Sequence, residues 1–397
     1  MVVKQIYELI NSVSGEVLGK TDIVKEDLTG VVDLGNEVFN QGAVDNYVKS
    51  LVNHIGKVIF VNRPYAGKIP SVLMDAWEFG SVLEKISAEI PAATENDTWN
   101  LTDGHEYKQD IFHKPVVSAK FFNSKVTFEV PVSITERQVK ESFSSAAQLN
   151  GFLSMIYSAV EKSMTIKTDA LIMRTINNMI GETLFADAAK FTTSGKTINY
   201  GSASTVRCVN LLYLYNQAKG TNLTADKCLT DAEFIRFASY QMGLYADRLQ
   251  SISTLFNVGG KERFTPKDAL HTILLSDFAK GAQAYLYADT KNMEQVLLPN
   301  AESVASWQGS GQDYGFAHTS AINIKTSGNH DISIGGVLGV MFDRDALGVT
   351  NSDKRVTTNY NAKAEFFNNY YKFDAAYFND TNENFVEIGR ASCRERV

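Results

Sequence analysis

The sequence lacks a long apolar run, a basic block and a recognisable catalytic motif. Its 397 residues include only 3 cysteines and 7 prolines, and the formal net charge is −7. No apolar run approaches the roughly 20 residues that a membrane-spanning helix needs, and residues 1–10 contain no hydrophobic signal core. Without a cationic cluster, tight or sequence-reading DNA binding is not expected. These absences predict a protein made in the cytoplasm that spans no membrane.

The cysteines are too few for a disulfide framework. Cys208 and Cys228 have no CxxC spacing and are predicted to be buried, reduced thiols. Cys393 lies in the last ten residues, 388–397 (IGRASCRERV), which match the translation of a common sequencing adapter. We therefore interpret this segment as an artefact, in preference to a basic tail, and exclude it from the fold. Without its three arginines and one glutamate, the net charge would be −9.

One segment resembles the end of a phosphate-binding P-loop. Gly195-Lys196-Thr197 matches the last three residues of the P-loop motif. However, Lys190 occupies the position where the motif needs its first glycine. The residues after it do not resemble a helix start. A β-turn is therefore the favoured interpretation, and a soluble nucleotide-binding enzyme is kept as the alternative from a different functional class.

Other candidate sites are weaker still. Asp380, Asn382 and Asn384 mimic the first ligands of a calcium loop, but Phe385 stands where that loop needs glycine, so an Asx-rich turn is favoured. Asp343 and Asp345 are expected in a turn after a strand. The six histidines are scattered and form no zinc-binding pattern: His54, His105, His113, His271, His318 and His330. No catalytic, cofactor-binding or metal-binding residue is assigned, and no enzymatic activity is expected.

The clearest pattern runs from Val116 to Gly181. Apolar residues alternate from Val126 to Ile134, as in a half-buried strand. The period then becomes helical, and no proline interrupts residues 147–181, which predicts one helix about 50 Å long at roughly 1.5 Å per residue. Ser133 with Glu136, or Thr135 with Gln138, offers a capping box before it.

The preceding residues predict a long two-legged ribbon. Ser81–Ile90 would be the first leg, the polar segment Pro91–Pro115 its loop, and Val116–Ile134 the returning leg. Trp99 falls in the polar loop, where two interpretations stand. It either packs locally within the loop or anchors the ribbon in a neighbouring subunit.

The remaining elements indicate α+β organisation, with strands towards both ends and helices between them. Thr205 is the predicted cap and Gly220 the stop of a helix over 204–219, and Thr230 with Glu233 opens a helix to about Leu249. The other expected elements are a helix over 44–55, a strand over 57–62, a strand over 269–275, a helix over 276–286, a loop-rich stretch over 299–329, and strands over 332–342 and 355–378.

Five stretches together resemble the major capsid proteins of tailed bacteriophages, which have the Hong Kong 97-type fold, and are similar to those of phages of Gram-positive hosts. They are SVLMDAWEFGSVLEKISAEIP (71–91), KFFNSKVTFEVPVSITERQVKESF (120–143), KSMTIKTDALIMRTINNMI (162–180), GVLGVMFDRDALG (336–348) and NAKAEFFNNYYKFDAAYFNDTNENF (361–385).

The resemblance implies a division of the chain and a function. Residues 1–80 would be the N-terminal arm, 81–134 the extended loop, 135–181 the spine helix of the peripheral domain, 182–334 the axial domain and 335–387 the returning strands of the peripheral domain. The protein would assemble through pentamers and hexamers into an icosahedral virion shell around packaged double-stranded DNA, without sequence-specific contacts. An encapsulin-type compartment is an alternative on the same fold.

The resemblance also implies partners. These are other copies of the chain, a portal protein and a scaffolding protein. The scaffolding protein is expected to be a separate chain, because residues 1–40 are too short to act as a built-in scaffold. A prohead protease and a decoration protein accompany some members. Some members join subunits by isopeptide bonds, for which Lys108 or Lys114 would be candidates. No acidic residue is identified to assist that reaction, so no such site is assigned.

Overall fold

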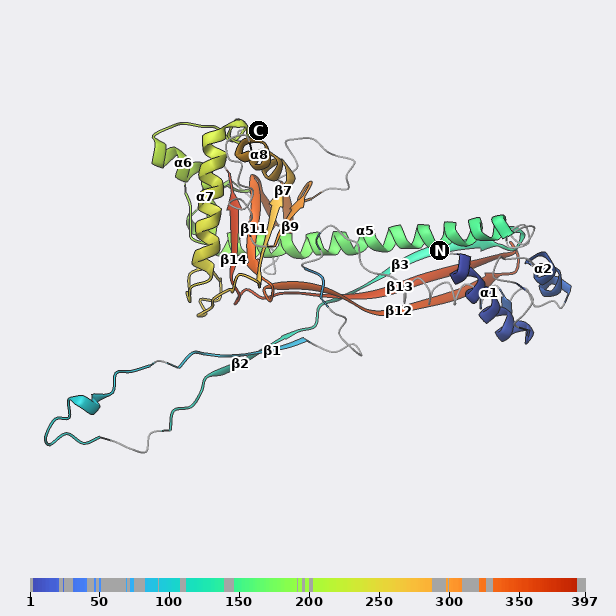
Figure 1. The fold of residues 1–397 in the computed structure, drawn as a ribbon, viewed down its shortest axis with the longest axis horizontal. Helices are drawn as coiled ribbons and strands as arrows, with labels where there is room; N and C mark the ends of the chain where they lie inside the picture. The colour runs from blue at the N-terminus through green and yellow to red at the C-terminus, as the bar shows by residue number, and fades with distance from the viewer. Residues whose placement is uncertain are drawn as a thin grey trace. The chain divides into compact units, whose positions relative to one another are not determined.

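The chain folds into helices and strands that divide between two compact units (Figure 1). The structure, a computed structural model, describes residues 3–20, 24, 31–40, 46–47, 50, 69, 72–74, 83–91, 93–107, 112–138, 146–190, 192–194, 197–199, 203–287, 298, 300–308, 321–325 and 331–390. The first unit contains 1–80, 124–175 and 348–377, and the second contains 81–123, 176–347 and 378–397.

The elements confirm the α+β class expected from the sequence. The helices are α1 (Val3–Leu18), α2 (Val31–Asn40), α5 (Ala146–Ala186), α6 (Leu211–Lys219), α7 (Ala232–Leu249) and α8 (Ser276–Tyr287). The strands are β1 (Leu83–Ala88), β2 (Val117–Phe122), β3 (Lys125–Thr135), β4 (Thr192–Ser194), β5 (Thr197–Asn199), β6 (Cys208–Asn210), β7 (Leu270–Leu275), β8 (Ala301–Val304), β9 (Ile322–Lys325), β10 (Asp331–Ile334), β11 (Val337–Asp343), β12 (Leu347–Asn361), β13 (Phe366–Asn379) and β14 (Phe385–Gly389). Short 3₁₀ turns include η3 (Asp97–Trp99).

The first unit is built on a three-stranded sheet in the order β12-β13-β3. β3 pairs antiparallel with β13, from Lys125 opposite Ala376 to Thr135 opposite Phe366. Side chains along β3 alternate between exposed and half-buried or, at Ile134, buried, which confirms the predicted period of two. Where β3 ends, Thr135 and Gln138 form a reciprocal capping box: each backbone N–H donates to the other's side chain, at 3.0 and 3.2 Å.

The predicted long helix is confirmed as α5, which has 41 residues and would span about 60 Å at roughly 1.5 Å per residue. Its buried positions up to residue 175 are Ile156, Val160, Met164, Thr168, Leu171, Ile172 and Thr175. The buried hydroxyls of Thr168 and Thr175 donate to the carbonyls four residues earlier, at 3.0 and 2.9 Å. These two threonines therefore sit inside the helix with their hydroxyls paired.

The second unit contains a five-stranded mixed sheet in the order β6-β14-β11-β7-β8 and a four-stranded sheet in the order β4-β5-β10-β9. β11 is buried along its whole length between β14 and β7. Its Gly339 allows close pairing, because a Cβ there would lie 2.9 Å from the Ile273 carbonyl oxygen. Residues of α6, α7 and α8 join those of the sheet in one buried apolar cluster.

The sequence located α6 and α7 but misplaced their first residues. α6 begins at Leu211 with Asn210 as its N-cap, whereas Thr205 precedes the short strand β6. Gly220 ends α6 in the left-handed conformation, with φ 64°, as predicted. α7 is capped by Asp231, whose side chain accepts from Phe234 N at 2.7 Å, and not by Thr230.

Residues 388–390 belong to the fold, so the exclusion of the whole segment 388–397 from the fold was wrong for these three residues. Ile388 and Gly389 belong to β14 and pair with both β11 and β6. Arg390 donates from its backbone to the Gly336 carbonyl at 2.7 Å and from its guanidinium to the Ala225 carbonyl at 2.6 Å. Residues 391–397 lie outside the described residues, as do nearly all of the helix expected over 44–55 and the whole strand expected over 57–62.

Candidate assembly interface

The predicted ribbon exists, but its returning leg is shorter than expected. β1 pairs antiparallel with β2, from Leu83 opposite Phe122 to Ala88 opposite Val117, and Glu89 N extends the ladder to the Val116 carbonyl at 2.9 Å. The prediction that 116–134 forms one leg was wrong from Lys125 onward, because β3 pairs with β13 instead. The ribbon legs are therefore 83–89 and 116–122.

The ribbon carries many large apolar side chains that nothing in the described chain covers. Trp99 is 94% exposed and Phe112 is 86% exposed. The other exposed large apolar residues of this segment are Ile86, Ile90, Leu101, Tyr107, Val116, Val117 and Phe121. Scattered single apolar residues on a surface are ordinary, whereas many large exposed apolar side chains in one segment are typical of an interaction site. The interpretation of Trp99 as packed locally within the loop is therefore wrong.

Local hydrogen bonds shape the tip of the ribbon. The side-chain oxygen of Asn96 accepts from Thr98 N at 2.9 Å, in an Asx turn that leads into η3. The Tyr107 hydroxyl accepts from Thr102 N at 3.0 Å, and its ring lies 4.7 Å from that of His105. These contacts define a turn without burying Trp99.

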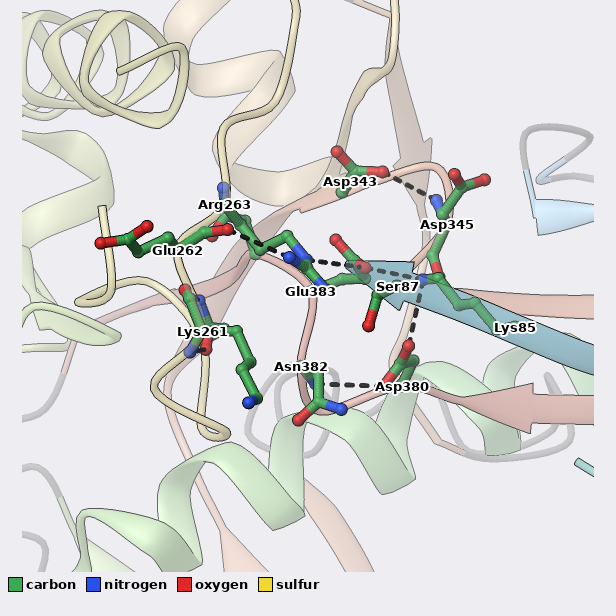
Figure 2. Close-up of polar contacts among 12 residues, drawn as sticks. Lys85, Ser87, Lys261, Glu262, Arg263, Asp343, Asp345, Asp380, Asn382 and Glu383 are labelled. Carbon is green, nitrogen blue, oxygen red and sulfur yellow. Dashed lines mark hydrogen bonds and ion pairs between the residues drawn. The ribbon is translucent and has the colours of Figure 1, made fainter. Parts of the chain in front are cut away.

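The base of the ribbon is held by an ion-pair network (Figure 2). Lys85 Nζ lies 3.0 Å from Asp380 Oδ2 and 2.8 Å from Glu383 Oε1, and it donates to the Asp345 carbonyl at 3.1 Å. From the other leg, Lys120 Nζ lies 3.0 Å from Asp380 Oδ1. Both legs of the ribbon are thus tied to the turn between β13 and β14.

A neighbouring loop supplies further charges to this network. Arg263 Nε lies 3.1 Å from Glu383 Oε1, and Lys261 Nζ lies 2.7 Å from Glu89 Oε1. The first pair is largely buried, with Arg263 and Glu383 side chains 19% and 10% exposed, so water screens it less than a surface pair. We refer to Lys85, Lys120, Arg263, Asp380 and Glu383 as the ribbon-base network.

The electrostatics of Asp380 reflect its two lysine partners. Burial by itself would raise the pKa of this carboxyl, but Lys85 and Lys120 hold the pKa below its usual value. The side chain is only 3% exposed. Asp380 is therefore charged at neutral pH and anchors both legs of the ribbon.

The acidic and amide residues singled out in the sequence fall where turns were expected. Asp380 accepts from Asn382 N at 3.1 Å, which confirms the Asx turn. Asp343 accepts from Asp345 N at 2.9 Å in the turn after β11. Sequence reasoning missed the ribbon-base network, because its members come from four separate segments of the chain.

Other residues considered from the sequence take structural places. Cys208 and Cys228 are free and buried, as predicted, and burial raises the pKa of each thiol. Trp307 is fully buried, and its indole N–H donates to the Val337 carbonyl at 2.9 Å. His105, His113 and His271 are described, whereas His54, His318, His330 and Trp77 lie outside the described residues.

Sites for chemistry are not evident in the part of the chain that the structure describes. Among these residues, no group of three or more histidine, cysteine, aspartate or glutamate side chains could hold a metal ion. Gly195, Lys196 and Lys108 are outside the described residues, and Lys114 is exposed on the ribbon. None of the described helices is both long enough and apolar enough to cross a membrane.

The described residues thus combine a 41-residue helix with an anchored ribbon whose large apolar side chains are exposed. The profile of the Phi29-like phage major capsid protein family matches residues 8–388. The chain belongs to this family, and it is a major capsid component of a tailed-phage virion.

Several solved structures are similar to the chain. A chain from "Capsid structure of Staphylococcus phage Andhra" is 11% identical with a TM-score of 0.52, covering 83% of this chain and 86% of that chain. A chain from "Structure of head fiber and inner core protein gp22 of native bacteriophage P68" is 9% identical with a TM-score of 0.46 (81% and 84% covered). One from "Capsid structure of the Cyanophage P-SCSP1u" is 10% identical with a TM-score of 0.42 (81% and 87%). The first of these similarities shows a shared fold. No curated protein matches the chain.

Proposed function

We propose that this capsid protein assembles through pentamers and hexamers into a closed icosahedral shell around packaged double-stranded DNA, and that the ribbon is its principal assembly element. The observation that carries this proposal is the series of uncovered apolar side chains from Ile86 to Phe121. An isolated two-stranded ribbon is marginally stable in water. Docking on another copy of the chain would cover these side chains and stabilise the ribbon at the same time.

The ribbon-base network supports this role. Its ion pairs hold both legs of the ribbon to the turn before β14, so the ribbon projects from a fixed base. Preorganisation of this kind reduces the ordering cost that each contact between subunits must offset. Trp99 and Phe112, being the most exposed large side chains of the segment, are the residues we assign as anchors.

The finer division of the chain is also part of the proposal. Residues 1–80 would act as the N-terminal arm, and 182–334 as the axial domain. The compact units support an extended loop that ends near Asn123, because Ser124 onward groups with the other unit. A portal protein and a separate scaffolding protein would be partners, with a protease and a decoration protein where the phage encodes them. We propose no catalytic activity for the subunit.

The test replaces the anchors and measures assembly. Trp99→Ser combined with Phe112→Ser should greatly reduce the yield of closed shells, measured by sedimentation velocity and negative-stain electron microscopy. Truncating an anchor commonly costs about 2 kcal/mol or more, which weakens each contact roughly thirtyfold. Thermal unfolding of the unassembled subunit should not change, because the described chain buries little of either side chain.

The matched control is Asn100→Ser, which changes an exposed polar residue of the same tip and removes no apolar surface. It should assemble as the parent does. Normal shell yield from the Trp99 and Phe112 double variant would refute the role of the ribbon. The family match gives no support to the encapsulin-type compartment or the nucleotide-binding enzyme.

A further inference from the structure

The exposed face of α5 differs in charge from the chain as a whole. Among the residues between 156 and 175 whose burial is described, the exposed positions are Ala159, Lys162, Ile166, Lys167, Ala170 and Arg174. Three of these six residues are basic and none is acidic, although the whole chain has a net charge of −7. We refer to these six residues as the α5 basic face.

The acidic residues of the same segment are placed differently. Glu161 and Asp169 are half-buried, and both take part in interactions within the chain. In the described part of the chain, Lys162 and Lys167 form no ion pair. Arg174 lies over the ring of Tyr377, with its guanidinium carbon 4.9 Å from the ring centroid, while remaining exposed. The acidic residues of this segment are therefore half-buried, and its cations are exposed to solvent.

Helix geometry places the basic face on one side of α5. At about 100° per residue, its six positions fall within an arc of roughly 140°, and Lys162 and Arg174 are about 18 Å apart along the axis. Over that length a DNA duplex carries about ten phosphates, since it has one charge per roughly 1.7 Å. The small side chains of Ala159 and Ala170 permit close approach between the cations.

We propose that the α5 basic face is the surface with which the capsid protein contacts the phosphate backbone of the enclosed duplex DNA. The inference rests on the proposed shell function. Each subunit would contribute only three cations, so its own contact is weak and independent of base sequence. Many subunits repeat the contact across a shell, and multivalency makes it significant for the whole particle. The overall acidic charge of the chain disfavours tight binding of DNA to the subunit as a whole.

The test measures the salt dependence of DNA binding by the full-length chain after closed shells have been removed. Fluorescence anisotropy with a labelled random-sequence duplex, between low and moderate salt, gives the slope of log K against log salt. The parent should show a slope of about −2.7, because each phosphate contact contributes about −0.9. Lys162→Gln combined with Lys167→Gln should reduce its magnitude by about 1.8.

A second double variant tests whether the change in salt slope is specific to the α5 basic face or follows from any loss of two positive charges. Lys227→Gln combined with Lys363→Gln also removes two exposed positive charges, but from turns outside α5, and it should keep the parental slope. Equal losses in both double variants, or no measurable binding by the parent, would overturn the inference. The inference would also be overturned if the α5 variant bound DNA as the parent does but no longer co-assembled with a scaffolding protein. That result would identify the α5 basic face as a protein-docking surface.

Shell formation by the same variants reports on the proposed function separately. Negative-stain electron microscopy of both double variants should show closed shells, because the altered lysines are exposed and contact no described carboxylate closely. Shells formed by an α5 variant that keeps the full salt slope would overturn the DNA contact and leave the shell function intact. Failure of the parent to form shells would instead refute the proposed function.

Discussion

Asp380 connects both legs of the ribbon to one buried turn. Its two carboxylate oxygens each pair with a different lysine, Lys85 and Lys120, at 3.0 Å. Because it is 2% exposed, removing its charge would leave two partly buried ammonium groups short of a partner. Leaving a buried charge unpaired is costly, even where the intact pair contributes little net stability.

Asp380→Asn should therefore destabilise the subunit. We expect a loss of about 1–3 kcal/mol in the free energy of unfolding, with the lower end set by the partial exposure of both lysines. Chemical denaturation of the unassembled subunit measures this loss. Hydrogen exchange should also become faster in β1 and β2.

Asp345→Asn is the matched control. Its side chain is 57% exposed, and Lys85 contacts only its backbone carbonyl. The substitution should cost less than about 0.5 kcal/mol. Equal losses from Asp345→Asn and Asp380→Asn would show that the ribbon-base network has no special role in stability.

The effect of Asp380 should also depend on pH in a defined direction. Lys85 and Lys120 hold the folded-state pKa of Asp380 below its ordinary value, so its stabilisation is fully present above the ordinary pKa and is lost as pH falls through the lower, folded pKa. The difference in unfolding free energy between the parent and Asp380→Asn should stay constant from pH 5 to 8 and shrink below about pH 4. A difference that changes most between pH 6 and 8 would contradict this assignment.

Sequence reasoning at the scale of single residues found local partners only. The Asx turn at Asp380 and the buried thiols of Cys208 and Cys228 follow from residue type and spacing, and the structure confirms them. The ion pairs of Asp380 could not be predicted, because Lys120 is 260 residues away in the chain. The exposure of Trp99 was one of two open interpretations, and it depends on what lies around the ribbon.

Helix α7 illustrates how capping decides where an element begins. Two adjacent residues, Thr230 and Asp231, are both good cap types, but Asp231 makes the cap bond to Phe234 N. The Thr230 hydroxyl instead donates to the Lys227 carbonyl at 2.9 Å. The structure therefore assigns the N-cap contribution to Asp231 alone.

Asp231→Ala should reduce the free energy of unfolding by about 1 kcal/mol, within the usual range for loss of an N-cap. Thr230→Ala should cost distinctly less, since its hydroxyl forms only an exposed hydrogen bond within the preceding turn. Thermal unfolding of the two variants side by side checks the order. A larger loss for Thr230→Ala would restore the cap expected from the sequence.

Periodicity predicted the elements better than it predicted their pairing. Long, uninterrupted patterns gave α5, β3, β7 and β13 correctly, because burial of one face dictates the spacing of apolar residues. The pairing of β3 with β13, and not with β1, joins segments more than 200 residues apart and leaves no local signal. Helices α1 and α2 were missed, although Ile10, Val13, Leu34 and Val38 have helical spacings and are fully buried.

At the scale of the whole molecule, the order of the predicted elements along the chain indicated a capsid protein. The ribbon, the long helix and the returning strands were all present in the sequence pattern, and the family match over residues 8–388 confirms the capsid interpretation. Assembly itself depends on surfaces of other copies, which no pattern within one chain can specify. The charge contrast between the acidic chain and the α5 basic face likewise required knowledge of which side chains are exposed.

The most direct measurement is negative-stain electron microscopy combined with sedimentation of the full-length chain, expressed with and without the genes that neighbour its own. Closed shells, or rings of five and six subunits, are the predicted result, because the uncovered ribbon requires another copy to bury it. A compact monomer at high concentration in both preparations would contradict the proposed self-assembly.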